Sequence, residues 1–268
     1  LCIMKTEWIK ETLTYKIFKI IKESQYELFE TLAGIGENFY LVIRNIFKVN
    51  PKEILTQASR FGIDSLPLVI IIVCLSTMII SLQVSEKMVE QGAKDYIGTL
   101  ITVITIREMA PIMGSFAVIS MIGSSMASEI ATMKVTSQVD AIKVMKINPV
   151  TYLITPKVIA GFVIMPSVIL VSAFIGILSS YISVILTTDM SFQSFLDSVW
   201  LGLFEKDLWA MNLKSAVFGG LIALISSSIG YKTTGGAIDV GIATTNAVVW
   251  SFTSVVIADF FISYLFFY

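Results

Sequence analysis

Four ionisable residues lie inside stretches of the chain that are otherwise apolar: Arg107, Glu108, Lys214 and Asp259. A charge in a hydrocarbon environment costs at least a few kcal/mol, so each of these residues needs a partner. Carboxylates held against an ammonium group can fix helices to one another or can exchange protons. We therefore expect one charge cluster, in which Lys214 bridges the two carboxylates and Arg107 makes the set neutral.

The depths of these residues in the apolar stretches are compatible with such a cluster. Counted from the outer ends at about 1.5 Å per residue, Glu108 lies roughly 16 Å, Lys214 roughly 9 Å and Asp259 roughly 14 Å deep. The cluster should hold the second, fourth and fifth stretches together and border a transport path. A static network that only sets helix register is an equally open interpretation. A proton-coupled carrier, in which these groups titrate during transport, is another.

Other kinds of chemistry have few candidate residues. The chain contains no histidine, and its two cysteines, Cys2 and Cys74, form neither a disulfide framework nor a metal-ligand motif. The phosphate-loop pattern G-x-x-x-x-G-K-[ST] does not occur, and "GYKTTGG" at Gly230 to Gly236 lacks its first half. We therefore expect no enzyme active site, no metal and no cofactor on this chain.

The composition is typical of a membrane protein. Hydrophobic residues make up 55% of the 268 residues, charged residues 15%, and the mean hydropathy is +0.82. The formal net charge of -1 gives no indication of a nucleic-acid partner. Since a bilayer core takes about 20 apolar residues per helix, the sequence predicts an all-α integral membrane protein with five spans. These are roughly Ser65 to Val84, Ile97 to Ser128, Leu153 to Thr187, Leu208 to Tyr231 and Ala247 to Tyr268. Pro111 and Pro166 allow kinks in the second and third spans.

The distribution of lysine and arginine predicts the orientation in the membrane. These residues gather before the first span, between the second and third spans, and after the fourth. Because basic loops stay in the cytosol, the N-terminus is expected inside and the C-terminus outside.

The first 64 residues are expected to form a cytosolic segment and an interfacial helix, and residues 65–268 the transmembrane domain. In "LFETLAGIGENFYLVIRNIFK", apolar residues recur at helical spacing: Leu28, Leu32, Ile35, Phe39, Val42, Ile43 and Ile46. This pattern predicts an amphipathic helix in the membrane interface. An amphipathic helix packed on a soluble partner is the alternative.

A short charged segment, "EIATMKVTSQVDAIKVMKINP", separates the second and third spans. Ser137 and Asp140 have the spacing of a capping box, and Asn148-Pro149 supplies a stop, so the pattern predicts a short helix at about residues 137–147. Val139, Ile142 and Met145 form one apolar stripe, which another surface must cover because so short a helix is marginal in water. It is either a loop helix on the lipid headgroups or a docking element for a cytosolic partner.

Several motifs occur between Arg107 and Gly161: Arg-Glu-x-x-Pro, a stretch of small residues, Glu-x-x-x-Met-Lys-Val-Thr-x-Gln-Val-Asp-Ala, and Asn-Pro-x-x-Tyr-Leu. This run resembles the permeases of the MlaE-like family, the membrane subunits of lipid ABC transporters. Weaker similarity extends to "NLKSAVFGG", "TTGGAIDVGIATTNAVV" and "IADFFISYLFF". The family usually has Gly-Arg-x-Gly where this chain has Ser120 to Gly123, so no role of that arginine is carried over. Ala131 also replaces a usual glycine.

The resemblance implies that the short helix is a coupling helix that docks on a cytosolic ATPase. The residues assigned to this contact are Glu129, Met133, Lys134, Gln138, Val139, Asp140, Ile142, Lys143 and Met145. It further implies a homodimer, ABC ATPase subunits that hold ATP and Mg, and an outer MCE-domain lipid-binding protein. The cargo would be phospholipid or a related amphiphile, in a bacterial inner membrane or a plastid inner envelope. A non-transporting scaffold that recruits a cytosolic protein through the Val139 face is the remaining alternative.

Overall fold

The structure is a computed structural model that describes residues 29–46 and 49–268. The predictions for earlier residues, including Leu28 in the apolar stripe, lie outside the described residues. In this described part the chain is helical and has no β-strand. Five helical runs within it are long and apolar enough to cross a membrane: Pro51–Glu90, Lys94–Val135, Val150–Thr187, Glu205–Lys232 and Ala237–Phe267. The all-α class and the five predicted spans are confirmed at this level.

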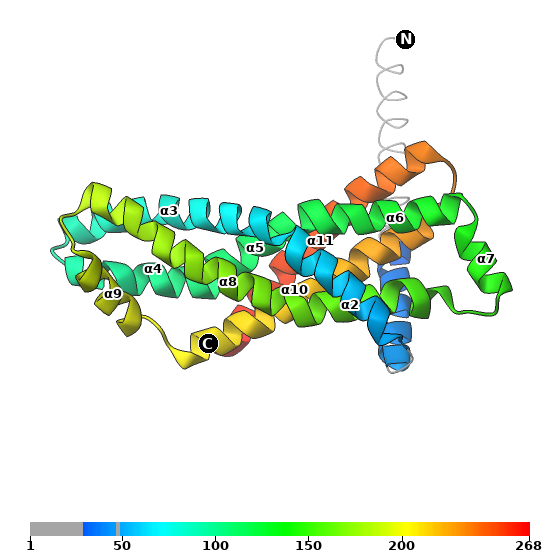
Figure 1. Cartoon of the computed structure of the whole chain (residues 1–268), viewed down its shortest axis with the longest axis horizontal. Helices are drawn as coiled ribbons and strands as arrows, with labels where there is room; N and C mark the ends of the chain where they lie inside the picture. The colour runs from blue at the N-terminus through cyan, green and yellow to red at the C-terminus, as the bar shows by residue number, and fades with distance from the viewer. Residues whose placement is uncertain (1–28, 47–48) are drawn as a thin grey trace, which may run out of the picture.

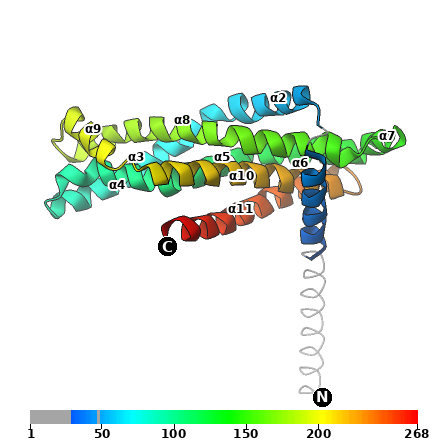
Figure 2. The ribbon, with the colours of Figure 1, turned by 90° about the horizontal axis from the view of Figure 1, so that it is seen from below.

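The five runs lie side by side in an elongated bundle (Figures 1 and 2). The short helix α7 (Gln138–Val144) lies at one end of the bundle and α9 (Phe192–Leu201) at the other. A helix formed by residues 29–45 runs across the long axis near the α7 end in both views. A helix in this direction would lie parallel to a bilayer that the bundle crosses. Its interfacial position stays a prediction.

The first run begins earlier than predicted. The Asn50 side chain accepts a hydrogen bond from the Lys52 amide (3.1 Å) and caps α2 (Pro51–Ser59), with Pro51 at its first position. A π-helical turn, Arg60–Asp64, joins α2 to α3 (Leu66–Glu90). The predicted start at Ser65 therefore falls inside a continuous helical run. The more polar residues before Ser65 also form a helix, because a helix satisfies their backbone hydrogen bonds as well.

The second run consists of α4 (Ile97–Ile104), α5 (Ala110–Val118) and α6 (Ser124–Val135). Two π-helical turns, Thr105–Met109 and Ile119–Gly123, separate them. The first turn ends just before Ala110-Pro111, where the missing N–H of proline interrupts regular helical bonding. The run extends past the predicted end at Ser128, to Val135.

The remaining long helices are α8 (Thr155–Thr187), α10 (Glu205–Lys232) and α11 (Ala237–Phe267). A π-helical turn, Val150–Ile154, leads into α8, and Pro166 lies inside that helix. The polar residues before Ala247 were assigned to a loop, but they form the first turns of α11. The Thr244 and Thr245 hydroxyls donate to backbone carbonyls four residues earlier, which hides their polarity within the helix. The sequence reading also missed α9, which buries Phe195 and Ser198.

Small residues allow the long helices to approach closely. A Cβ at Gly219 would lie only 2.3 Å from the carbonyl oxygen of Gly161, so α8 and α10 contact each other through backbone. A Cβ at Gly114 would overlap the Ile169 side chain at 2.3 Å, where the second and third runs pack. At these positions a larger side chain would push the helices apart.

Candidate functional site

The Lys214 ammonium group lies at the centre of a charge cluster between three long helices. Its Nζ atom is 3.1 Å from Glu108 Oε1 and 2.8 Å from Asp259 Oδ1, and its side chain is 0% exposed. The Asp259 contact is an ion pair at close range, whereas Glu108 accepts an aligned hydrogen bond. The predicted bridge between the two carboxylates is confirmed, and it joins the second, fourth and fifth runs. Its part in transport stays a prediction.

Pro111 gives Lys214 a third partner. In a regular helix the amide of residue 111 would donate to the carbonyl of Arg107, but proline has no N–H. That free carbonyl accepts a hydrogen bond from Lys214 Nζ at 2.8 Å. The proline in the Arg-Glu-x-x-Pro motif therefore creates an acceptor that the buried ammonium group uses, one residue before the carboxylate that it also binds.

Arg107 does not join this cluster through its side chain, and the predicted neutral set of four is wrong. Its Nε atom pairs with Asp207 Oδ2 at 2.9 Å, and its guanidinium carbon lies 4.3 Å from the centre of the Phe267 ring. Asp207 is buried in the first turn of α10. Asp207 falls one residue before the predicted start of the fourth span at Leu208, so hydropathy did not indicate that it pairs with an arginine of the second span.

The cluster contains two carboxylates and one ammonium group, which leaves one formal negative charge. Glu108 Oε1 also accepts from the Ser263 hydroxyl at 3.1 Å, a contact that the sequence reading missed. The Glu108 side chain is 36% exposed, compared with 13% for Asp259. This arrangement can fix three helices to one another, and Glu108 is the more open of its two carboxylates. Within the described residues, no group of acidic and cysteine side chains is suited to hold a metal ion.

A second ionic group lies nearer the α7 end. Glu129 Oε2 is 2.8 Å from Lys157 Nζ and 3.3 Å from Arg60 Nη1. Lys157 is buried in the first turn of α8, inside the predicted third span, and the sequence did not indicate its partner. Glu129 thus joins the first, second and third runs within this chain. Its predicted contact with an ATPase stays a prediction.

The apolar stripe of α7 is mostly covered by the chain itself. Val139 and Ile142 are buried in a cluster with Val42 of the helix 29–45, Leu153 and Ile154 at the start of the third run, and residues near them. The prediction that another polypeptide covers this stripe is wrong for these two residues, since intramolecular packing already covers them. The same burial removes the Val139 face as a scaffold surface.

The end of α7 exposes apolar side chains to solvent, and one of them, Met145, belongs to the predicted stripe. Val144 and Met145 are 83% and 62% exposed, and Gln138 and Lys143 are also exposed, whereas Met133 is partly buried. The predicted capping box is wrong. Ser137 has the left-handed φ of 60° and its side chain makes no capping bond. Asp140 instead accepts hydrogen bonds from Lys143 (3.2 Å) and Lys134 (3.4 Å). These bonds lower the pKa of Asp140 below its ordinary value of 3.8.

Five membrane-length helices that bury ion pairs between their members define a polytopic membrane protein. Residues 54–265 match the family described as Permease MlaE. A "Probable ABC transporter permease protein" of Synechocystis sp. is 34% identical over 232 residues, which cover 87% of this chain and 88% of that protein. One of Rickettsia prowazekii is 35% identical over 242 residues, covering 89% and 93%. "Protein TRIGALACTOSYLDIACYLGLYCEROL 1, chloroplastic" of Arabidopsis thaliana is 34% identical over 220 residues, covering 82% and 63%. The chain therefore belongs to the MlaE permease family, and the resemblance drawn from its motifs is confirmed.

Proposed function

We propose that the chain is the transmembrane subunit of an ATP-driven ABC transporter that moves phospholipid or a related amphiphile between membranes. Family membership and the bacterial relatives support the permease assignment. The name of the Arabidopsis relative refers to a glycolipid, trigalactosyldiacylglycerol, which supports a lipid cargo. ATP and Mg would be held by separate ATPase subunits, because this chain has no phosphate loop.

The position of α7 is the main observation that supports coupling of this chain to an ATPase. Its buried residues, Val139 and Ile142, pack on residues of the third and fourth runs, so a displacement of α7 is transmitted to the spans. Its exposed residues, Val144 and Met145, can enter an apolar groove on a partner. In this proposal α7 is the coupling helix, and the docking surface is its C-terminal end, which includes only Met145 of the stripe that the sequence indicated.

The complete transporter is proposed to contain two copies of this chain. On α11, Ile242, Val249 and Val256 recur every seven residues and are more than half exposed, a pattern that supports pairing with a second copy. An MCE-domain protein would receive or deliver lipid at the α9 end. The orientation has the N-terminus inside and the C-terminus outside, in a bacterial inner membrane or a plastid inner envelope.

The α7 contact is tested by exchanging Met145 for Asp together with Val144 for Asp. Co-purification with the ABC ATPase of the same transporter should be lost, while the permease still inserts into the membrane. Leu55→Asp is the matched control, because Leu55 is 73% exposed on α2 and is not part of α7. Undiminished ATPase binding by the α7 variant would contradict the proposal.

Transport itself is tested in vesicles that contain the permease with its ATPase and MCE-domain partners. Fluorescent phospholipid should leave the vesicles only when ATP and Mg are supplied. Movement that persists without ATP hydrolysis but needs a proton gradient would instead support a carrier that uses Glu108, Lys214 and Asp259. No lipid movement with every partner present would support a scaffold.

A further inference from the structure

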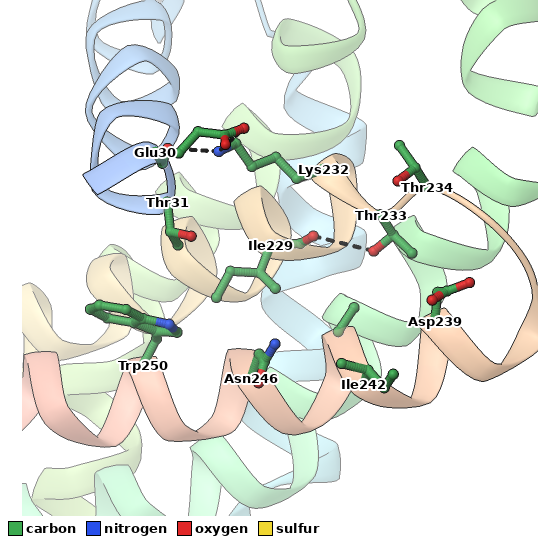
Figure 3. A pocket seen from close by; sticks show the side chains of 11 residues that line it. Glu30, Thr31, Ile229, Lys232, Thr233, Thr234, Asp239, Ile242, Asn246 and Trp250 are labelled. Carbon is green, nitrogen blue, oxygen red and sulfur yellow. Dashed lines mark hydrogen bonds and ion pairs between the residues drawn. The ribbon is translucent and has the colours of Figure 1, made fainter. Parts of the chain in front are cut away.

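A cavity of about 470 Å³ lies at the α7 end of the bundle, away from the Lys214 cluster. Its walls come from the helix 29–45, the last turn of α10 and the segment after it, and the first turns of α11 (Figure 3). The volume is within the range of roughly 300–1,000 Å³ that is usual for ligand sites. Neither the family assignment nor the proposed transport mechanism uses this cavity.

One side of the cavity carries a positioned cation. Lys232 Nζ donates to the backbone carbonyl of Glu30 at 2.6 Å and lies 3.5 Å from the Glu30 carboxylate. A Cβ at Gly34 would lie 2.6 Å from Lys232 Cε, so the glycine provides the space in which the lysine side chain crosses the helix 29–45. The Lys232 side chain remains partly exposed at the cavity.

Another side of the cavity carries a positioned anion. Asp239 Oδ2 accepts a hydrogen bond from the Gly236 amide at 2.8 Å, which fixes the carboxylate at the start of α11. In Figure 3, Thr233 and Thr234 lie on the side between Lys232 and Asp239, and Asn246 lies below. The Lys232–Glu30 ion pair and the Asp239 carboxylate thus face one cavity. The Thr234 hydroxyl and the Asn246 amide can donate hydrogen bonds there, whereas the Thr233 hydroxyl donates to the Ile229 carbonyl.

The cavity also has an apolar side. Ile229, Ile242 and Trp250 line it, and Figure 3 shows Trp250 on the side away from Asp239. Tryptophan prefers the level of the lipid headgroups, because its apolar ring can contact the acyl chains there while its N–H is hydrated. The neighbouring helix 29–45 exposes Phe29 and Leu32 close to Glu30, as a helix at a membrane surface would. The opening of the cavity is therefore at headgroup level.

We propose that this cavity binds the head group of an ethanolamine phospholipid from the adjoining leaflet. The phosphate lies toward Lys232 and the Thr234 hydroxyl, and the primary ammonium group lies toward Asp239. The glycerol and the first acyl carbons contact Trp250. A primary ammonium donates three hydrogen bonds to such a site, whereas a choline group needs an aromatic cage. Among the described residues that line this cavity, Trp250 is the only aromatic one. The bound lipid would link the helix 29–45 to α10 and α11.

The test uses the full chain in nanodiscs that contain either phosphatidylethanolamine or phosphatidylcholine, each mixed with phosphatidylglycerol. A photoactivatable phosphatidylethanolamine should crosslink to residues 229–250, and Asp239→Asn should reduce this labelling about tenfold, the effect of losing one hydrogen bond to a charged group. The asparagine oxygen can still accept from Gly236, so α11 stays capped. Glu53→Gln is the matched control, because Glu53 lines a second cavity of about 410 Å³ at this end of the bundle.

Soluble phosphoethanolamine is added as a competitor to distinguish a membrane lipid from a free zwitterion. The proposal expects no competition at millimolar concentration, retained labelling in Glu53→Gln, and a preference for the ethanolamine lipid over the choline lipid. Equal labelling of the wild type and Asp239→Asn would overturn it, as would equal occupancy by the two lipids. Full displacement by the soluble compound would also overturn it, since the ligand would then come from solution.

Discussion

Replacement of Lys214 by methionine removes the central cation of the intramembrane cluster while keeping a long unbranched side chain. Three groups then lose a partner: Glu108 and the Arg107 carbonyl lose a hydrogen-bond donor, and Asp259 loses its ion-pair partner. Glu108 is 36% exposed, so water can partly replace the lost donor there. The contribution of the Glu108 contact to the loss of stability is therefore small. Asp259 is left as a mostly buried carboxylate without a counter-charge.

The expected loss of stability follows from these contacts. Removing one partner of a buried ion pair costs about 3–5 kcal/mol, and the unpaired carbonyl adds about 1–3 kcal/mol that overlaps with this term. We expect a total of about 3–5 kcal/mol, which corresponds to a melting temperature lower by roughly 6–20 °C if each kcal/mol shifts it by about 2–4 °C. Thermal unfolding in mild detergent, followed by circular dichroism, measures this shift.

Two further variants identify the cause of the shift. Lys206→Met makes the same substitution on the same helix at an exposed lysine, and it should change the melting temperature by no more than a few degrees. Combining Lys214→Met with Asp259→Leu removes the unpaired charge and should restore part of the lost stability. An unchanged melting point for Lys214→Met, or no recovery in the double variant, would refute the account of a buried and mutually dependent cluster.

Two other predictions concern helix packing and the charge on α7. Gly219→Ala should destabilise the protein by about 1–3 kcal/mol, because the added methyl meets the Gly161 backbone, whereas Gly220→Ala has ordinary space and should be tolerated; the same unfolding assay compares them. The lowered pKa of Asp140 means that its lysine contacts stabilise α7 above pH 3.8 and are lost as the pH falls through the still lower folded-state pKa. Amide exchange of α7, corrected for intrinsic rates, should therefore increase in acid, and Asp140→Asn should abolish this pH dependence.

Hydropathy predicted the spans better than their ends. The five apolar stretches all became long helices, because a lipid environment leaves the backbone few alternatives. The ends were misplaced where polar residues continue a helix, as before Ser65 and before Ala247. Threonine hydroxyls bonded to preceding turns and a π-helical junction make these segments helical, and neither feature has a hydropathy signal.

Partner choice among the charged residues was predicted only in part. The bridge of Lys214 to Glu108 and Asp259 followed from depth and charge, whereas the pairing of Arg107 with Asp207 did not. Arg107 and Asp207 are a hundred residues apart, and their contact depends on how the second and fourth runs are rotated. The burial of Val139 likewise depends on packing between segments that are distant in sequence.

The sequence by itself determined that this chain is a membrane protein of five spans, and that its internal charges must be paired. These conclusions follow from the high cost of placing polar groups in hydrocarbon, which applies at every position regardless of the fold. Only the tertiary structure decided which partner each charge takes and which face of α7 remains free. Those choices depend on helix rotation and on close approach at glycines such as Gly161 and Gly219, and both are set by packing among all the helices together.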